Sequence, residues 1–380
     1  MGSYHPGVPG PENADERINL VVLFGGQSAE HDVSCVTAKH VVAAADPGRY
    51  DLEPVGITRD GDWVRAEDAR AAIERGAAAL PAALSATGSA IDHEAAIVPT
   101  ASGETVVVFP LLHGPMGEDG TVQGLLEQAG VPYIGAGVLG SAVAMDKAMA
   151  KDVLAAKGIP QPRWLAYRSS DLDTLPVDEI TRELGLPCFV KPANLGSSVG
   201  VSKAHDRAEL TAALELAFSY DEWVVVEEAV VAREIELAVL GNTDLRVSVP
   251  GEVTPAAELY DYEDKYLDGR AELTIPAELP PEVVETFQDL ALRAYRALRA
   301  EGMARVDFLY EEGGRGPLLN EINTIPGFTP ISMYPKLWAA SGLPYDQLID
   351  ELVALALERH ERRTKTRRTS RTSREELQAN

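Results

Sequence analysis

The sequence predicts an α/β domain followed by α+β structure. In the first third of the chain, apolar runs typical of strands alternate with helical patterns, as in a doubly wound sheet. After about residue 140, strand-like runs follow one another closely, which indicates mostly antiparallel pairing. The chain has 380 residues, of which 45% are hydrophobic and 24% charged, so two or three domains with sizeable cores are expected.

The N-terminal strands place two polar loops at one edge of the expected sheet. Ile18 to Phe24 is a continuous apolar run, typical of a buried parallel strand, and Gly25-Gly26 ends it. Ligands of such sheets bind beyond the carboxyl ends of the strands, where the loops 25–34 and 113–120 fall. The other expected elements are helices at 33–45 and 121–129, strands at 51–57, 106–112 and 131–134, and an alanine-rich helical or variable surface segment at 66–86.

The remainder of the chain is punctuated by short strands. We expect strands at 188–191, 199–203, 223–227, 234–240 and 245–249, and helices at 145–157, 207–218, 281–298, 332–341 and 345–358.

Charge and composition exclude several classes of protein. The net charge of −25 argues against a general nucleic-acid binder. Met1 to Glu16 has no signal-peptide pattern and predicts a disordered lead-in, and no apolar run is long enough to span a bilayer. The two cysteines, Cys35 and Cys188, fit a reducing cytoplasm. The basic run from Arg359 to Arg374 predicts a disordered, solvated tail, with a nucleic-acid or acidic-partner role as the open alternative.

A hairpin near the C-terminus predicts a divalent metal site. Two strand-like runs, MARVDFLY and PLLNEIN, flank a turn with two glycines. If Tyr310 pairs with Leu318, then Asp307 faces Glu321 and Arg305 faces Asn323. Because side chains alternate along a strand, these four side chains share one face of the hairpin. Opposed carboxylates repel each other unless a cation lies between them, and Mg²⁺ prefers carboxylate and phosphate oxygens. A solvated face with an Arg-Asp pair is the alternative.

Two further segments are compatible with nucleotide binding. The run KPANLGSSVGVSK, residues 191–203, places a lysine at a strand end before a small, flexible loop, although a plain hairpin turn explains it equally well. The run WVVVEEAVVAREIELAVL, residues 223–240, places three glutamates near a linker between strands, where exposed glutamates are the simpler reading. No Walker A motif occurs in the chain.

Taken together, these segments resemble the D-alanine–D-alanine ligases of the ATP-grasp family over roughly residues 18–358. Eight motifs occur in the family's order. They are GGQSAEHDVS, HGPMGEDG, MDK, KPANLGSSVGVSK, VEEAVVAREIE, YDYEDKY, ARVDF and NEINTIPGFTPIS. The resemblance implies a Rossmann-like N-terminal domain followed by a two-domain ATP-grasp fold. The expected division is a disordered lead (1–17), the N-terminal domain (18–140), a central domain (141–243), a C-terminal domain (244–358) and a basic disordered tail (359–380).

The resemblance also implies the nucleotide and metal ligands. Lys147, Lys191 and Lys265 are expected at the ATP phosphates, and two Mg²⁺ or Mn²⁺ ions at Asp307, Glu321 and Asn323. The linker residues expected at adenine and ribose are Glu227, Glu228, Val230 and Glu234. Glu228 departs from some relatives, which have lysine there.

For the two D-alanine substrates, the resemblance implies a further set of residues. Glu30 and His113 are expected at the first substrate, and Arg305, Gly327 and Ser332 at the second substrate and the oxyanion. Ser197 is expected to link Glu30 to Tyr266, which lies on a lid, residues 260–268, that excludes water.

The function implied is ATP-dependent formation of D-alanyl-D-alanine through an acyl phosphate, for peptidoglycan synthesis in the cytoplasm, by a homodimer. A D-alanine–D-lactate ligase is the rival, which Tyr266 disfavours. A non-enzymatic nucleotide-binding or tail-mediated module is the alternative from another class, and measurable ATP turnover would dispose of it.

Overall fold

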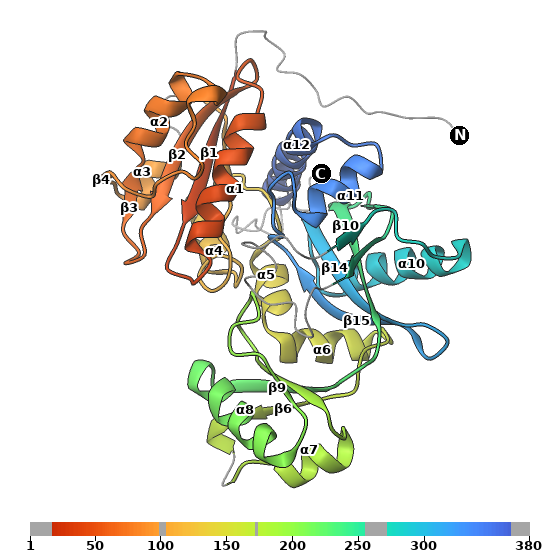
Figure 1. The fold of residues 1–380 in the computed structure, drawn as a ribbon. Coiled ribbons are helices and arrows are strands. Elements are labelled where there is room, and N and C mark those ends of the chain that lie inside the picture. The colour runs from red at the N-terminus through yellow and green to blue at the C-terminus, as the bar shows by residue number, and fades with distance from the viewer. Residues whose placement is uncertain (1–16, 99–103, 172–173, 255–271, 366–380) are drawn as a thin grey trace, which may run out of the picture.

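Three β-sheets organise the chain (Figure 1), and the computed structural model describes residues 17–98, 104–171, 174–254 and 272–365. The first sheet has the order β4-β3-β2-β1-β5. The strands β1 (Ile18–Gly25), β2 (Tyr50–Ile57) and β5 (Val106–Pro110) are parallel, with β5 at one edge. At the other edge, β3 (Trp63–Arg65) and β4 (Ser89–Ala90) pair antiparallel. The helices of this part are α1 (His31–Ala44), α2 (Glu67–Glu74), α3 (His93–Ile97) and α4 (Thr121–Ala129).

The apolar run of β1 is buried because β1 lies between β2 and β5 and is covered on both faces. The predicted α/β domain is therefore confirmed. One expectation within it is corrected. The strand expected at 131–134 is reduced to a single bridge between Val108 and Tyr133, because Gly130 ends α4 immediately before it. The alanine-rich segment, expected to be helical or a variable surface segment, contains the helix α2 and the 3₁₀ turn η1 (Ala77–Ala79).

The second sheet is the largest and antiparallel, with the order β13-β12-β10-β14-β15 and β11 beside β10. Its strands are β10 (Arg233–Gly241), β11 (Arg246–Val247), β12 (Gly251–Thr254), β13 (Glu272–Thr274), β14 (Gly302–Glu311) and β15 (Gly316–Asn323). One face packs on α5 (Val138–Met145), α6 (Lys147–Ala156) and α10 (Pro281–Ala297). The other face packs on α11 (Met333–Ala340) and α12 (Tyr345–Lys365), which also contact the core of the first sheet.

The third sheet forms a separate layer at the lower end of the view in Figure 1, with the order β6-β9-β7-β8. It consists of β6 (Trp164–Arg168), β9 (Trp223–Glu228), β7 (Cys188–Pro192) and β8 (Ser202–Ala204), all antiparallel. The turn η2 (Ser169–Asp171) and the helices α7 (Val177–Glu183) and α8 (Arg207–Tyr220) complete this layer. The α+β expectation for the second half is thus confirmed.

Two predicted domain boundaries differ from the structure. A division at residue 243 would separate β10 from β14, with which it pairs from Arg233 to Gly241. The predicted disordered tail is wrong for residues 359–365, because α12 continues to Lys365 and Arg359 is buried. Within the part of the chain that the structure describes, none of the helices combines the length and apolarity needed to cross a bilayer.

Candidate active site

A cavity of about 670 Å³ lies where the three sheets meet, and it collects most of the predicted site residues. Its size is in the range of small-molecule sites. Of the predicted residues, the cavity is lined by Glu30, His113, Lys147, Lys191, Ser197, Glu227, Glu228, Glu234, Arg305, Asp307, Glu321, Asn323, Gly327 and Ser332. Val230 is described but is not part of the lining, and Lys265 and Tyr266 lie outside the described residues.

One corner of the cavity is built around the carboxylate of Glu30, the N-cap residue of α1. Ser197 Oγ donates a hydrogen bond to Glu30 Oε1, across two segments far apart in sequence. A Cβ at Gly114 or Gly196 would lie 2.9 or 3.1 Å from Glu30 Oε2, so both glycines make room for this carboxylate. Ser197 has a φ of 48°, a left-handed conformation that is uncommon outside glycine and often marks a functional loop.

His113 and Glu118 complete this corner, and Glu118 is a residue that the sequence reasoning missed. His113 Nδ1 lies 3.1 Å from the carbonyl oxygen of Ile325, whereas its buried Nε2 has no partner among the described residues. Burial lowers the pKa of His113, so the ring is neutral at pH 7. Glu118 accepts from the backbone N–H groups of Gly114 (2.7 Å) and Ile325 (3.3 Å). Burial, with the nearby charge of Glu30, raises the pKa of Glu118 to about 8.

A buried cluster of one carboxylate and two ammonium groups forms the base of the cavity. Glu227 forms an ion pair with Lys151 Nζ (3.0 Å) and accepts a hydrogen bond from Lys191 Nζ (2.9 Å). Lys191 also donates to Asn320 Oδ1 (3.3 Å). Burial alone would raise the pKa of Glu227, but the two lysines outweigh it and hold the pKa at about 2. Lys151 was missed by the sequence reasoning. Its signal is a lysine on the buried stripe of α6, beside Ala148 and Leu154.

Two other residues expected at the nucleotide, Lys147 and Glu228, make different contacts within the protein. Lys147 Nζ donates to the carbonyl oxygen of Leu195 (2.6 Å). This bond connects the start of α6 to the loop between β7 and β8, which carries Ser197. The carboxylate of Glu228 is held by Arg163 (2.8 Å) and Arg315 (2.5 Å). Its side chain is therefore occupied by ion pairs, and its backbone N–H donates to Arg163 O (3.0 Å), so both fix the strand connection.

The hairpin of β14 and β15 brings the predicted metal ligands together. Asp307 pairs with Glu321 and Arg305 with Asn323, as the period-two reasoning predicted. The predicted pairing of Tyr310 with Leu318 is wrong by one residue, because the register shifts between Asp307 and Phe308. Asn320 is the extra residue, and this β-bulge places its side chain at Lys191.

Arg305 is held by two carboxylates in this structure. Its Nε and Nη2 each donate to Asp307 (2.7 Å), in a fork-shaped pair of bonds. Glu236 on the neighbouring β10 forms an ion pair with Arg305 Nε (2.9 Å) and was missed by the sequence reasoning. Asn323 Nδ2 also donates to Asp307 (2.8 Å). The Arg-Asp pair is therefore real, but it lies inside the cavity and not on a solvated face.

Ser332 and Gly327 lie on the segment that leads into α11. Ser332 Oγ lies 2.8 Å from Thr329 Oγ1 and accepts from the backbone N–H of Thr329 (3.2 Å). Gly327, Thr329 and Ser332 all line the cavity, as Arg305 does.

The donor set at the hairpin fits a divalent cation that is completed by phosphate. Within the described ranges, no three His, Cys, Asp or Glu side chains converge as a closed metal cage. Mg²⁺ needs only one or two carboxylates when substrate phosphates supply further oxygens. Asp307 and Glu321 provide two carboxylates on one face, with the amide of Asn323 beside them.

Lysines from α6 and β7 on one side of the cavity, and carboxylates from the large antiparallel sheet on the other, define an ATP-grasp enzyme. The family model described as D-ala D-ala ligase N-terminus matches residues 19–136, and that described as D-ala D-ala ligase C-terminus matches residues 153–354. The chain therefore belongs to the D-alanine–D-alanine ligase family.

Individual relatives agree over nearly the whole chain. It is 49% identical over 354 residues to a D-alanine–D-alanine ligase of Geobacillus kaustophilus, covering 90% of this chain and 95% of the relative. The structure of the Coxiella burnetii D-alanine–D-alanine ligase is 36% identical, with a TM-score of 0.79 over 93% and 97% of the two chains.

Two further solved structures are similar. The Bacillus anthracis D-alanine–D-alanine ligase complexed with ATP is 30% identical, with a TM-score of 0.70 over 92% and 99% of the chains. The VanG D-Ala:D-Ser ligase of Enterococcus faecalis is 33% identical, with a TM-score of 0.75 over 90% and 100%.

Proposed function

We propose that this chain uses ATP to join two D-alanine molecules into D-alanyl-D-alanine, with release of ADP and phosphate. The observation that carries the proposal is that the Glu30–Ser197 corner and the lysine and carboxylate groups expected at the phosphates line one cavity. The relatives named as D-alanine–D-alanine ligases support the same substrates. The rival D-alanine–D-lactate activity is not favoured by these relatives.

The nucleotide lies, in this proposal, between the third sheet and the large sheet. Lys147 and Lys191 face the phosphates, and the backbone from Glu227 to Val230 with Glu234 contacts the adenosine. Two Mg²⁺ or Mn²⁺ ions would be held by Asp307, Glu321 and Asn323. When bound, the ions neutralise charge that builds on the transferred phosphoryl group.

The first D-alanine lies in the Glu30 corner. Its ammonium is bound by the Glu30 carboxylate, and the unpartnered Nε2 of neutral His113 accepts a second hydrogen bond. A carboxylate oxygen of this substrate then attacks the γ-phosphorus of ATP, and the bond from that phosphorus to the β,γ-bridging oxygen breaks. The products of this step are ADP and D-alanyl phosphate.

The second D-alanine lies on the side of Arg305. Its neutral amine attacks the carbonyl carbon of D-alanyl phosphate, and the tetrahedral intermediate expels phosphate and loses the amine proton. Arg305 with the Gly327 N–H stabilises the oxyanion, and Arg305 with Ser332 binds the carboxylate. Because Asp307 and Glu236 hold Arg305 in this structure, Arg305 has to change partners when this substrate binds.

A lid, a compartment and an assembly complete the proposal. Tyr266 and Lys265 lie outside the described residues, and we assign to their segment the exclusion of water from D-alanyl phosphate. The reaction is placed in the cytoplasm, where the product feeds peptidoglycan synthesis, and both cysteines are buried and unpaired. We expect a homodimer.

The test follows oxygen atoms through the reaction. With D-alanine labelled by ¹⁸O in its carboxylate, one labelled oxygen is expected in each phosphate released, because the attacking oxygen leaves with phosphate. Phosphate without label, together with dipeptide formation, would overturn the acyl phosphate route.

A further inference from the structure

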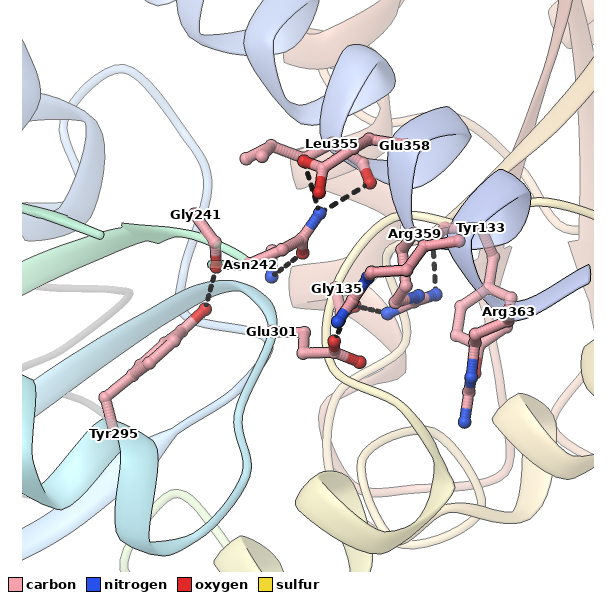
Figure 2. A network of polar contacts seen from close by, with 12 residues as sticks. Tyr133, Gly135, Gly241, Asn242, Tyr295, Glu301, Leu355, Glu358, Arg359 and Arg363 are labelled. Atoms are coloured by element: carbon pink, nitrogen blue, oxygen red, sulfur yellow. Dashed lines mark hydrogen bonds and ion pairs between the residues drawn. The ribbon is translucent and has the colours of Figure 1, made fainter. Parts of the chain in front are cut away.

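The last turns of α12 lie between the N-terminal domain and the large sheet (Figure 2). These turns extend past residue 354, where the match to the family's C-terminal model ends. Three arginines, Arg359, Arg362 and Arg363, project from them, and we call this set the basic end of α12.

On one side, the basic end contacts the segment that leaves the first sheet. Arg359 is only 3% exposed, and its guanidinium donates to the carbonyl oxygens of Gly135 and of Tyr133 (2.8 Å). The same guanidinium lies 4.1 Å from the centre of the Tyr133 ring. Arg363 pairs with Glu127 of α4, which also accepts from the Tyr133 hydroxyl (2.8 Å).

On the other side, α12 contacts the start of β14. Arg362 pairs with Glu301, the residue before β14 begins. Asn242 Nδ2 donates to Leu355 O (2.9 Å) and Glu358 Oε2 (3.0 Å), and its Oδ1 accepts from the N–H of Gly302 (3.1 Å). The strand that begins here carries Arg305 and Asp307.

The two sides also meet directly. A Cβ at Gly302 would lie 3.1 Å from three backbone atoms of Gly135, so the two backbones approach as closely as glycine allows. A buried guanidinium that satisfies two buried carbonyl groups costs more to remove than an exposed ion pair. The contact between the two sides is therefore fixed by Arg359 as well as by apolar packing.

We propose that the basic end of α12 clamps the N-terminal domain to β14 and thereby fixes the spacing between the two walls of the D-alanine pocket. One wall carries Glu30 and His113, and the other carries Arg305. Arg359 is a positioning residue, since it does not line the cavity. The inference rests on the proposed function for the identity of the substrates, but the clamp itself is a structural statement.

A charge-reversal cycle at the Arg363–Glu127 pair tests whether the basic end of α12 positions the pocket walls. Both side chains are partly exposed, so the fold is expected to survive the substitutions. Arg363→Glu and Glu127→Arg should each raise the apparent KM for D-alanine by about tenfold with a smaller change in the KM for ATP, and the double variant should restore it. The matched control is Arg246→Glu, which reverses the pair that Arg246 makes with Glu351 of α12 inside the large-sheet domain. Equal effects of the control, or no rescue in the double variant, would overturn the proposal.

Hydrogen exchange tests the clamp without reference to catalysis. In Arg359→Met, peptides that cover residues 131–142 and 299–304 should exchange faster than in the unmodified protein, whereas peptides of the third sheet should not change. Unchanged exchange at 131–142 in a folded variant would contradict the clamp. Hydrogen exchange needs no substrate, so it tests the clamp even if the chain does not make D-alanyl-D-alanine.

Discussion

Asp307 and Glu321 face each other across β14 and β15, at the place where both strands line the cavity. Opposed carboxylates in a sheet destabilise it unless cations compensate their charge. In this structure Arg305 neutralises Asp307. Burial would lower the pKa of Lys191, but the charges of Glu227 and then of Glu321 outweigh it and raise that pKa. Each of these two carboxylates therefore has a cationic side chain nearby in this structure.

Glu321→Gln is expected to lower kcat by roughly 10²- to 10³-fold, as for the loss of one group that stabilises transition-state charge. Circular dichroism should show an unchanged fold. Glu311→Gln, at the far end of the same hairpin and paired with Arg315, is the control and should retain activity. Full turnover of Glu321→Gln in saturating Mg²⁺ would refute the metal assignment.

Ser197→Ala removes the hydrogen bond to Glu30. A bond to a charged group contributes about 1.5–3 kcal/mol, so the apparent KM for D-alanine should rise at least about tenfold. Ser219→Ala, at an exposed position of α8, should change neither KM. Steady-state kinetics with each substrate varied in turn decides the matter, and a raised KM for ATP with an unchanged KM for D-alanine would speak against the assignment.

Glu118 should make stability depend on pH in a defined direction. Its pKa is raised from 4.5 to about 8, so the folded state keeps its proton while the unfolded state loses it. This contribution to stability is fully present below about pH 4.5 and is lost as the pH rises through about 8.

Relative to Glu118→Gln, the unmodified protein should therefore lose unfolding free energy between about pH 5 and about pH 9. Urea unfolding at both values measures the difference. Glu94→Gln, an exposed carboxylate of the same domain, controls for general charge effects. A difference that stays constant with pH, or grows in the opposite direction, would count against a buried protonated Glu118.

Lys151→Met should lower the free energy of unfolding by about 3 kcal/mol, because Glu227 then keeps only one of two cations inside the protein. Adding Glu227→Gln should recover part of the loss, since the buried charge is removed. Lys157→Met, at the exposed end of the same helix, should have little effect. If urea unfolding shows equal losses for Lys151→Met and Lys157→Met, the buried cluster is not the cause.

The fold and most of the site could be predicted because they depend on local patterns. The apolar run at Leu20 to Phe24 requires a strand covered on both faces, and period-two alternation puts Asp307 and Arg305 on one face. The bulge at Asn320 could not be predicted, because a one-residue insertion in the pairing leaves no mark in the hydrophobic pattern.

Other features were hidden by composition. Arg359 continues the buried stripe of Leu352 and Ala356, but it begins a run rich in arginine that reads as solvated. Glu236 reads as one of several glutamates near a linker, and only the pairing of β10 with β14 places it opposite Asp307. Long-range contacts such as these are set by sheet topology, which spacing in the sequence does not encode.

The most direct test of the proposed function is ATP-dependent phosphate release with Mg²⁺, in the presence of D-alanine, L-alanine, D-alanine with D-serine, or D-alanine with D-lactate, with products identified by mass. D-alanine alone is expected to support release and to give D-alanyl-D-alanine, and L-alanine to give neither. Release that requires D-lactate or D-serine, or no release with any pair, would contradict the assignment of D-alanine to both substrate positions.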